Sequence, residues 1–344
     1  MKILVAATMT PFLHGGADHH MQGLLGALKQ AGHQAELLRL PFKFEPAADV
    51  ERAMAHAAAL DLRCPNGIEI DKLISLQFPC WGLQHPDHVV WVMHQHRAVY
   101  ELYDDKTASP ALRSLRTAVT EFDNQTLARS STLFANSARV ANRLAQYNDL
   151  KATPLYHPPA GAEHFYCEPA QPYVFMPSRL EVLKRQSLLI EAASLMRSPL
   201  AIVFSGDGGQ RDVLRAQVER LGLGHRVRFL GHITESEKRA FYAHSLAVCF
   251  PAFDEDYGYI TLEAMLSSKP VITCTDSGGP LEFIRDGENG WVELPEPRAL
   301  AQRLDWLHAH QDQAVAAGHA ARASYDQAGL NWQHVVARLT DAAT

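Results

Sequence analysis

The sequence predicts an α/β protein built from two domains, each a parallel sheet flanked by helices. Three observations support this fold class. The chain has 344 residues, more than one ordinary hydrophobic core accommodates. Short apolar runs without polar alternation recur along it, and such runs are typical of strands buried on both faces. Amphipathic helical stretches separate these runs, which is the order of elements expected of parallel sheets.

The first half opens with a β-loop-α-β unit. Lys2–Ala7 is an apolar run, and a helix capped by Asp18 is expected to extend to about Ala31. Residues 34–40 form the next predicted strand. The intervening loop contains Gly15-Gly16, where a backbone without side chains can approach another group closely. The loop is no dinucleotide fingerprint, because G-x-G-x-x-G is absent.

The rest of this half continues the same alternation. We expect helices over 50–60, 109–129 and from 137 onward, and strands over 72–76, 89–93 and 132–135. His94 follows the strand 89–93, with His96 as the alternative. In open α/β sheets ligands gather just beyond the carboxyl ends of strands, so a histidine at this point is a candidate for ligand contact. A structural hydrogen bond explains such a histidine equally well.

A break in periodicity marks the domain boundary. Tyr156–Gly161 is rich in proline and glycine, and this composition persists to Pro172. The strand pattern then restarts with apolar runs at 173–176, 200–204, 227–230, 246–250 and 271–274. The second half is therefore predicted to be a parallel sheet as well.

Charged and glycine-rich motifs follow several strands of the second half. Arg179 and Lys184 come after the strand 173–176, and guanidinium and ammonium groups together suit a diphosphate. Gly206 lies in a turn between a strand and a helix. Glu255 and Glu263 flank the start of a helix predicted near Gly258, whose unpaired amides favour an anion. Two glutamates alone are more typical of a solvated acidic loop, so the choice between such a loop and a ligand site depends on the flanking residues.

Those flanking residues carry a family resemblance. Glu255-x7-Glu263, with Tyr257-Gly258 inside it and Lys269–Ile272 behind it, resembles the E-x7-E motif of retaining GT-B glycosyltransferases, most closely the GT4 group. Arg179-x4-Lys184, the turn at Gly206 and Leu230–Ile233 resemble further elements of that family. The resemblance covers nearly the whole chain and is strongest from 173 to 290. Asp256 and Ser267-Ser268 depart from the usual pattern.

The resemblance implies a GT-B fold, in which two Rossmann-like domains face each other across a cleft. The N-terminal domain, expected to bind the acceptor, would span 1–165, and the nucleotide-sugar domain 166–327. A C-terminal helix at about 328–344 would cross back onto the first domain. The implied reaction moves a sugar from a nucleotide-sugar to an acceptor hydroxyl of a glycan, lipid-linked glycan or small glycoside, with retention of configuration. Polysaccharide biosynthesis is one such role.

The resemblance also assigns site residues. Four are expected to act in catalysis: His94, Arg179, Lys184 and Glu255. Donor binding is expected from a larger set: Gly15, Gly16, Arg179, Lys184, Gly206, His232, Ile233, Glu255, Tyr257, Gly258, Tyr259, Ile260, Thr261 and Glu263. Arg179 and Lys184 would hold the diphosphate, Glu263 the ribose hydroxyls and Glu255 the sugar hydroxyls. No catalytic nucleophile is assigned.

Composition restricts the cofactors and partners. A net charge of -6 argues against nucleic acid as a partner. Histidines cluster at His14, His19 and His20, and imidazoles at this spacing can share an ion. No carboxylate-rich motif accompanies them, however, so we expect neither a metal site nor any other cofactor.

Cellular location is also suggested by the sequence. Five scattered cysteines without a CxxC pair suggest reduced thiols in a cytoplasm. The N-terminus continues as a strand, unlike a signal peptide, and no run of 18 apolar residues exists. Residues 97–143 hold seven basic and five acidic side chains, a slight excess that suits weak peripheral contact with the inner face of a membrane.

Two other functions fit part of the pattern. A nucleotide-sugar epimerase of the GT-B type would share the fold and the diphosphate site, but it would release an altered sugar nucleotide without an acceptor. A non-catalytic two-lobed sugar or nucleotide binding protein would not need Arg179-x4-Lys184 beside Glu255-x7-Glu263.

Overall fold

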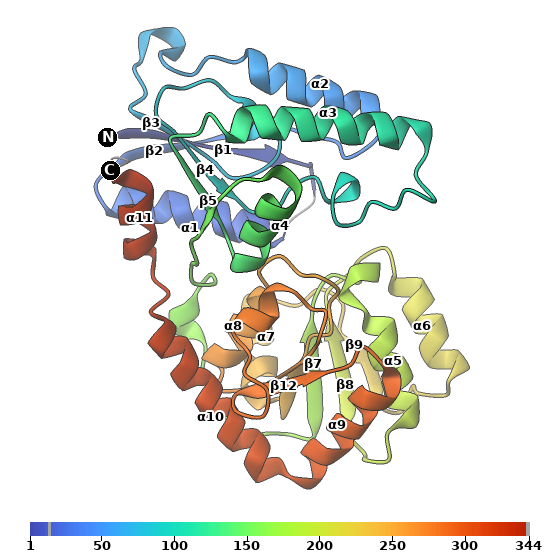
Figure 1. The fold of residues 1–344 in the computed structure, drawn as a ribbon. Coiled ribbons are helices and arrows are strands. Elements are labelled where there is room, and N and C mark those ends of the chain that lie inside the picture. The colour runs from blue at the N-terminus through green and yellow to red at the C-terminus, as the bar shows by residue number, and fades with distance from the viewer. Residues whose placement is uncertain (13–14, 342–344) are drawn as a thin grey trace. The chain divides into compact units, whose positions relative to one another are not determined.

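The computed structural model describes residues 1–12 and 15–341, and its internal contacts divide the chain into two units. Unit 1 comprises Met1–Ala160 and Asn331–Thr344, and unit 2 comprises Gly161–Leu330. The chain passes from unit 1 into unit 2 five residues before the predicted boundary. It returns to unit 1 three residues after the predicted position. Each unit is an α/β sandwich with its own parallel sheet (Figure 1).

The regular elements alternate as the sequence predicts. Unit 1 contains β1 (Lys2–Met9), α1 (Gly16–Gln30), β2 (Gln34–Pro41), α2 (Ala47–Ala59), β3 (Lys72–Ser75), β4 (His88–Val92), α3 (Pro110–Leu127), β5 (Thr132–Ala135), α4 (Ala138–Asn148), β6 (Thr153–Pro154) and α11 (Trp332–Thr340).

Unit 2 contains β7 (Tyr173–Pro177), α5 (Gln186–Leu195), β8 (Ala201–Ser205), α6 (Arg211–Arg220), β9 (Val227–Phe229), α7 (Glu235–His244), β10 (Ala247–Cys249), α8 (Tyr259–Leu266), β11 (Val271–Cys274), β12 (Gly290–Glu293), α9 (Pro297–Ala309) and α10 (Gln311–Ala328).

The sheet of unit 1 has the order β2-β1-β3-β4-β5-β6, with all neighbours parallel. Its side chains alternate between two faces. Val89 and Trp91 join a core with α1 and α11, whereas Val90 and Val92 join a core with α2 and α3. Figure 1 shows these helix pairs on opposite sides of the sheet. The C-terminal helix α11 therefore completes the core of unit 1.

The sheet of unit 2 has the order β12-β11-β10-β7-β8-β9, again all parallel. From β7 the chain proceeds to β8 and β9 on one side, and then to β10, β11 and β12 on the other. The direction reverses between β7 and β10, and such a switch point leaves a crevice at the carboxyl ends of the two strands. α5 packs on α6 and α9, and α8 packs on α10 (Figure 1).

The predicted fold class is confirmed, with local differences. Asp18 does not begin its helix: Gly15 is the N-cap of α1, and the Asp18 carboxylate accepts the Gly15 amide at 3.1 Å from inside the first turn. Strand β12 (Gly290–Glu293) was not predicted. The short strand β6 was not predicted either. Within the described residues, no helix combines the length and apolarity needed to cross a bilayer.

Candidate functional site

The strongest site lies at the switch point of unit 2. The loop after β7 carries Arg179 and Lys184, and the loop after β10 carries Glu255. These loops are about 70 positions apart in sequence, yet the Lys184 ammonium donates a hydrogen bond to the Glu255 carboxylate. Both side chains are mostly shielded, with 18% and 20% exposure. The fold thus places a cation and an anion next to each other, at the edge where ligands bind.

A second ion pair, which the sequence did not reveal, joins the same region. The Arg185 guanidinium donates to both carboxylate oxygens of Asp276, at 2.8 and 2.7 Å. It also lies over the ring of Phe253, with its Cζ 4.9 Å from the ring centroid. Bidentate geometry fixes orientation as well as distance. The loops after β7, β10 and β11 are therefore tied together by Lys184 and Arg185.

Backbone contacts reinforce this arrangement. The amides of Asp254 and Glu255 donate to the carbonyls of Asp276 and Ser277, each at 2.9 Å. Gly278 has a φ of +71°, and a Cβ there would lie 2.5 Å from the Glu255 carbonyl oxygen. Only glycine tolerates both conditions. Gly278 therefore allows the loop after β11 to support Glu255 from behind.

Helix α8 begins immediately after this loop. Gly258 is its N-cap in the left-handed region, with a φ of +85°, and the helix then contains Tyr259, Ile260 and Thr261 in its first turn. Tyr257 is buried and packs edge-on against the ring of Tyr259. The N-terminal amides of a helix attract anions. The predicted donor-binding residues from 257 to 261 are thus gathered at one helix start.

Glu263 lies one turn further along α8 and is held from α7. Lys238 donates to one carboxylate oxygen at 3.0 Å, and the buried Tyr242 hydroxyl donates to the other at 2.7 Å. Burial disfavours the charge on Lys238, but Glu263 and Glu235 outweigh that effect and raise its pKa. A carboxylate has about four acceptor positions, so Glu263 retains capacity for ligand hydroxyls. Lys238 and Tyr242 were not predicted as site residues.

Four further predicted residues belong to loops at the same edge. Arg179 is exposed, and its guanidinium has no recorded ion pair among the described residues. Gly206, with a φ of +111°, packs against the Ser178 carbonyl, 2.3 Å from where a Cβ would lie. Its amide donates to Gly231, which precedes His232 and Ile233. The structure gives Gly206 a packing role between two loops, and its expected part in donor binding stays a prediction.

The predicted residues of unit 1 also lie beyond strand ends. Gly15 has an extended backbone, which is not strained. A Cβ at this position would meet nothing within 4 Å, so the position is open. Gly16 is the first residue of α1. His94 is partly exposed, and its Nδ1 is 2.8 Å from the Gln95 carbonyl oxygen. His96 is buried among Phe42 and Phe78, which leaves His94 as the more accessible of the two histidines.

The early histidines have separate environments. His20 is buried, with its ring 4.0 Å from that of His157 and 4.1 Å from that of Trp91. His19 is exposed, and His14 lies outside the described residues. Among residues 1–12 and 15–341, no three His, Cys, Asp or Glu side chains cluster as metal ligands would.

Not all basic residues of 97–143 are available to a membrane surface. The Arg143 side chain is only 3% exposed and pairs with Glu101, which also binds Arg97. At least two of the seven cations are therefore engaged within unit 1.

Comparison with known proteins gives a family match for the unit that contains this site. Residues 168–324, nearly all of unit 2, match the family model described as "Glycosyl transferases group 1". The chain is 27% identical over 245 residues to a D-inositol 3-phosphate glycosyltransferase of Nocardia farcinica, covering 64% of this chain and 54% of that protein. It is 34% identical over 143 residues to the D-rhamnosyltransferase WbpZ of Pseudomonas aeruginosa, covering 41% and 37%. The chain thus spans about a third to a half of the length of these relatives.

Solved structures resemble the fold over its full length. The Anabaena protein Alr3699/HepE, solved in complex with UDP and glucose, aligns with a TM-score of 0.72, 20% identity and 99% coverage of both chains. The sucrose-phosphate synthase of Thermosynechococcus elongatus aligns with a TM-score of 0.77 and 16% identity, covering 98% and 97%. The chain therefore has the GT-B glycosyltransferase fold, and its second unit matches the glycosyl transferases group 1 family.

Proposed function

We propose that this protein is a retaining glycosyltransferase of the GT4 type, which moves a sugar from a nucleoside-diphosphate donor to a hydroxyl of a sugar or glycoside. The observation that carries the proposal is the contact between Lys184 and Glu255 at the switch point of unit 2. This contact joins a phosphate-binding cation to a hydroxyl-binding carboxylate. The group 1 family match of the same unit supports the assignment.

The charge arrangement suits a leaving diphosphate. In the transition state the bond to the sugar breaks and negative charge accumulates on the phosphate oxygens. Lys184 and the exposed Arg179 are positioned after the same strand, and fixed cations stabilise charge that develops there. The start of α8 adds oriented amides on the same edge of the sheet. These groups supply the electrostatic role that a divalent metal plays in other transferases.

The two glutamates are expected to bind different parts of the donor. Glu255 precedes α8 and contacts Lys184, so it is suited to hydroxyls of the transferred sugar. Glu263 is anchored by Lys238 and Tyr242, so it presents a rigid acceptor for ribose hydroxyls. Retention then requires no protein nucleophile when the departing phosphate takes the acceptor proton. The solved complex of HepE with UDP and glucose makes UDP and UDP-glucose the first ligands to test.

The decisive experiment combines binding and turnover. A thermal-shift screen against nucleoside diphosphates and nucleotide-sugars identifies the base, because a ligand that binds only the folded state raises the unfolding temperature. The stabilising donor is then incubated with candidate acceptors in EDTA. We expect transfer of the sugar, with retained anomeric configuration by NMR. Activity lost in EDTA and restored by magnesium or manganese would contradict metal independence. An altered sugar nucleotide without acceptor would indicate an epimerase, and binding without any conversion would indicate a binding protein.

A further inference from the structure

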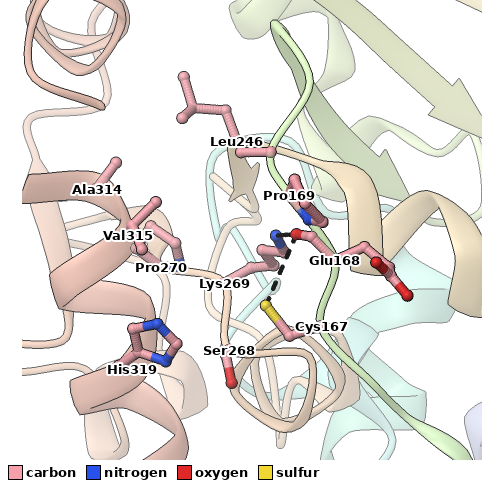
Figure 2. A pocket seen from close by; sticks show the side chains of 11 residues that line it. Cys167, Glu168, Pro169, Leu246, Ser268, Lys269, Pro270, Ala314, Val315 and His319 are labelled. Atoms are coloured by element: carbon pink, nitrogen blue, oxygen red, sulfur yellow. Dashed lines mark hydrogen bonds between the residues drawn. The ribbon is translucent and has the colours of Figure 1, made fainter. Parts of the chain in front are cut away.

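Unit 2 contains a pocket on the sheet edge opposite the candidate site. Its cavity is about 320 Å³ and is lined by residues that precede β7, β10 and β11, so it lies at the amino ends of these strands (Figure 2). Pro169, Leu246, Pro270 and Val315 form apolar walls. The polar groups include Cys167 and Lys269. The proposed transfer reaction uses none of these residues.

Lys269 is an unusual lysine, because only 4% of it is exposed. Its Nζ donates a hydrogen bond to the Glu168 carbonyl at 2.9 Å. The Cys167 sulfur lies 3.8 Å from the same carbonyl oxygen, as Figure 2 shows, so the amine and the thiol meet at one atom. Burial lowers the pKa of Lys269, and the neighbouring thiol only partly opposes this shift. A lysine with a lowered pKa spends more time as the neutral amine, which is the nucleophilic form.

Cys167 supplies the complementary property. It is one of two exposed cysteines, together with Cys64, whereas Cys80, Cys249 and Cys274 are buried. Exposure allows a small oxidant to reach the sulfur. Cys64 has no recorded amine at its sulfur among the described residues. The structure therefore holds one exposed thiol beside a buried amine, and one exposed thiol without it, which serves as an internal comparison.

We propose that Cys167 and Lys269 form a covalent sulfur–nitrogen bridge when the protein is exposed to a peroxide. The Cys167 thiolate attacks one peroxide oxygen, the O–O bond breaks, and hydroxide leaves, so that sulfur becomes a sulfenic acid. The neutral Lys269 amine then attacks this sulfur. The S–O bond breaks as the S–N bond forms, and the departing hydroxyl takes an amine proton and leaves as water. Sulfur is oxidised by two electrons, and the peroxide is reduced.

The bridge joins two segments of unit 2 that are remote in sequence. Cys167 lies in the segment that enters unit 2, and Lys269 lies in the turn between α8 and β11. The Lys269 amide already donates to the Ala264 carbonyl near the end of α8, at 2.9 Å. Oxidation would therefore fasten the end of α8 to the entry segment. A small thiol reverses the bond by attacking sulfur, which releases the amine and leaves a disulfide that a second thiol reduces.

The test is mass spectrometry of the full chain after treatment with hydrogen peroxide. We expect the intact mass to fall by about 2 Da, the loss of two hydrogens, because the oxygen of the sulfenic acid leaves as water. A disulfide between the buried Cys249 and Cys274 would cause the same loss. The protein is therefore digested without reductant, and the joined peptides containing positions 167 and 269 are sought. The bridged protein should also unfold at a higher temperature, and dithiothreitol should abolish both signals.

Three variants make the assignment specific. Cys64→Ser should retain the joined peptide. Cys167→Ser alters an exposed side chain and should lack it. Lys269→Arg keeps the positive charge and a donor for Glu168, but its guanidinium remains protonated, so it should lack the bridge as well. The proposal is overturned if the wild-type protein yields only sulfenic, sulfinic or sulfonic acid at Cys167, or if Lys269→Arg still gives the joined peptide.

Discussion

The loops beyond the two sheets differ in the contacts that hold them. Beyond the strands of unit 2, Lys184 contacts Glu255 and Arg185 binds Asp276, so ion pairs hold these loops together. Beyond β2, β3 and β4 of unit 1, aromatic rings in edge-to-face and tilted contact also hold the loops. Phe42 lies 5.0 Å from Phe44 and 5.7 Å from Phe78, with His96 among them. Under the proposed function, the edge of unit 2 is suited to a phosphate and the edge of unit 1 to a neutral ligand.

In that case one fold separates two tasks. Cationic side chains that bind an anionic ligand must stay accessible in the free protein. Partly exposed ion pairs hold such side chains in place and leave them accessible. A neutral sugar acceptor needs shape and hydrogen bonds more than charge. The following predictions test whether the contrast between the buried rings of unit 1 and the ion pairs of unit 2 governs stability and activity.

The largest expected effect concerns acid, because unit 1 encloses neutral histidines. Burial lowers the pKa of His20 to about 3 and of His88 and His96 to about 4, and it also lowers that of His157. In the unfolded chain histidine titrates near 6.5. The contribution of these neutral histidines to the free energy of unfolding is therefore complete above about pH 6.5, and it is lost as the pH falls toward 4. At pH 5, each of the three histidines with a pKa near 3 or 4 costs roughly 2 kcal/mol.

Protonation of Asp123 stabilises the folded state as the pH falls, but the buried histidines together have the larger, opposite effect. Burial raises its pKa to about 7, so the folded state gains roughly 2 to 3 kcal/mol from its protonation between pH 7 and pH 5. We expect unit 1 to lose protection before unit 2 on acidification. Hydrogen exchange, corrected for the intrinsic rate at each pH, reports the units separately. His20→Phe should reduce the pH dependence, and earlier loss in unit 2 would refute the contrast.

The next effect concerns the cation of unit 2. Lys184→Ala should lower kcat on the order of 10²-fold while changing KM little, because the diphosphate carries more charge in the transition state than in the bound donor. Steady-state kinetics with the stabilising donor measure both constants. Arg220→Ala, on the exposed face of α6, is the matched control and should behave as wild type. A raised KM with unchanged kcat would remove Lys184 from the catalytic role.

A third effect separates the two glutamates. Glu263→Ala should weaken free nucleoside diphosphate and intact donor equally, because Lys238 and Tyr242 hold Glu263 for the ribose. Glu255→Ala should leave diphosphate affinity nearly unchanged but depress transfer. Each lost hydrogen bond to a charged group is worth roughly 1.5 to 3 kcal/mol, which calorimetry resolves. If both variants weaken the binding of free nucleoside diphosphate equally, the assignment of Glu255 to the sugar is wrong.

The smallest effect concerns the loop behind Glu255. Gly278→Ala should lower transfer about tenfold, because its Cβ would collide with the Glu255 carbonyl and its φ is unfavourable for alanine. Gly224→Ala is the control, since a Cβ there meets nothing within 4 Å and its φ is not left-handed. Unchanged activity in Gly278→Ala would mean that the loop after β11 does not position Glu255.

Features with a local pattern were predictable from sequence. Apolar runs located most strands to within one or two residues, since a strand buried on both faces must be apolar throughout. β6 was missed because it has only two residues. β12, with the sequence Gly-Trp-Val-Glu, was missed because only its two central residues are large and apolar. The Glu255-x7-Glu263 spacing likewise identified the start of α8.

Features that depend on tertiary contact were not predictable. Arg185 and Asp276 are 91 positions apart, and Lys238 is 25 positions from Glu263, so no local spacing marks either pair. Gly206 is a related case. Its place in a turn between a strand and a helix was visible in the sequence, but the Ser178 carbonyl against which it packs was not. A glycine pattern reveals crowding without revealing what causes it.

The place of α11 has a consequence for biosynthesis. Val335, Val336 and Leu339 are fully or nearly fully buried in the core of unit 1, beside α1, yet they follow all of unit 2 in the chain. A ribosome therefore releases the first 160 residues long before the helix that closes their hydrophobic core. Unit 2 is continuous and is able to fold as it emerges, whereas unit 1 must wait for its last helix. We expect nascent unit 1 to expose the face of β1 and β4 during this interval, which makes it the half that depends on chaperones.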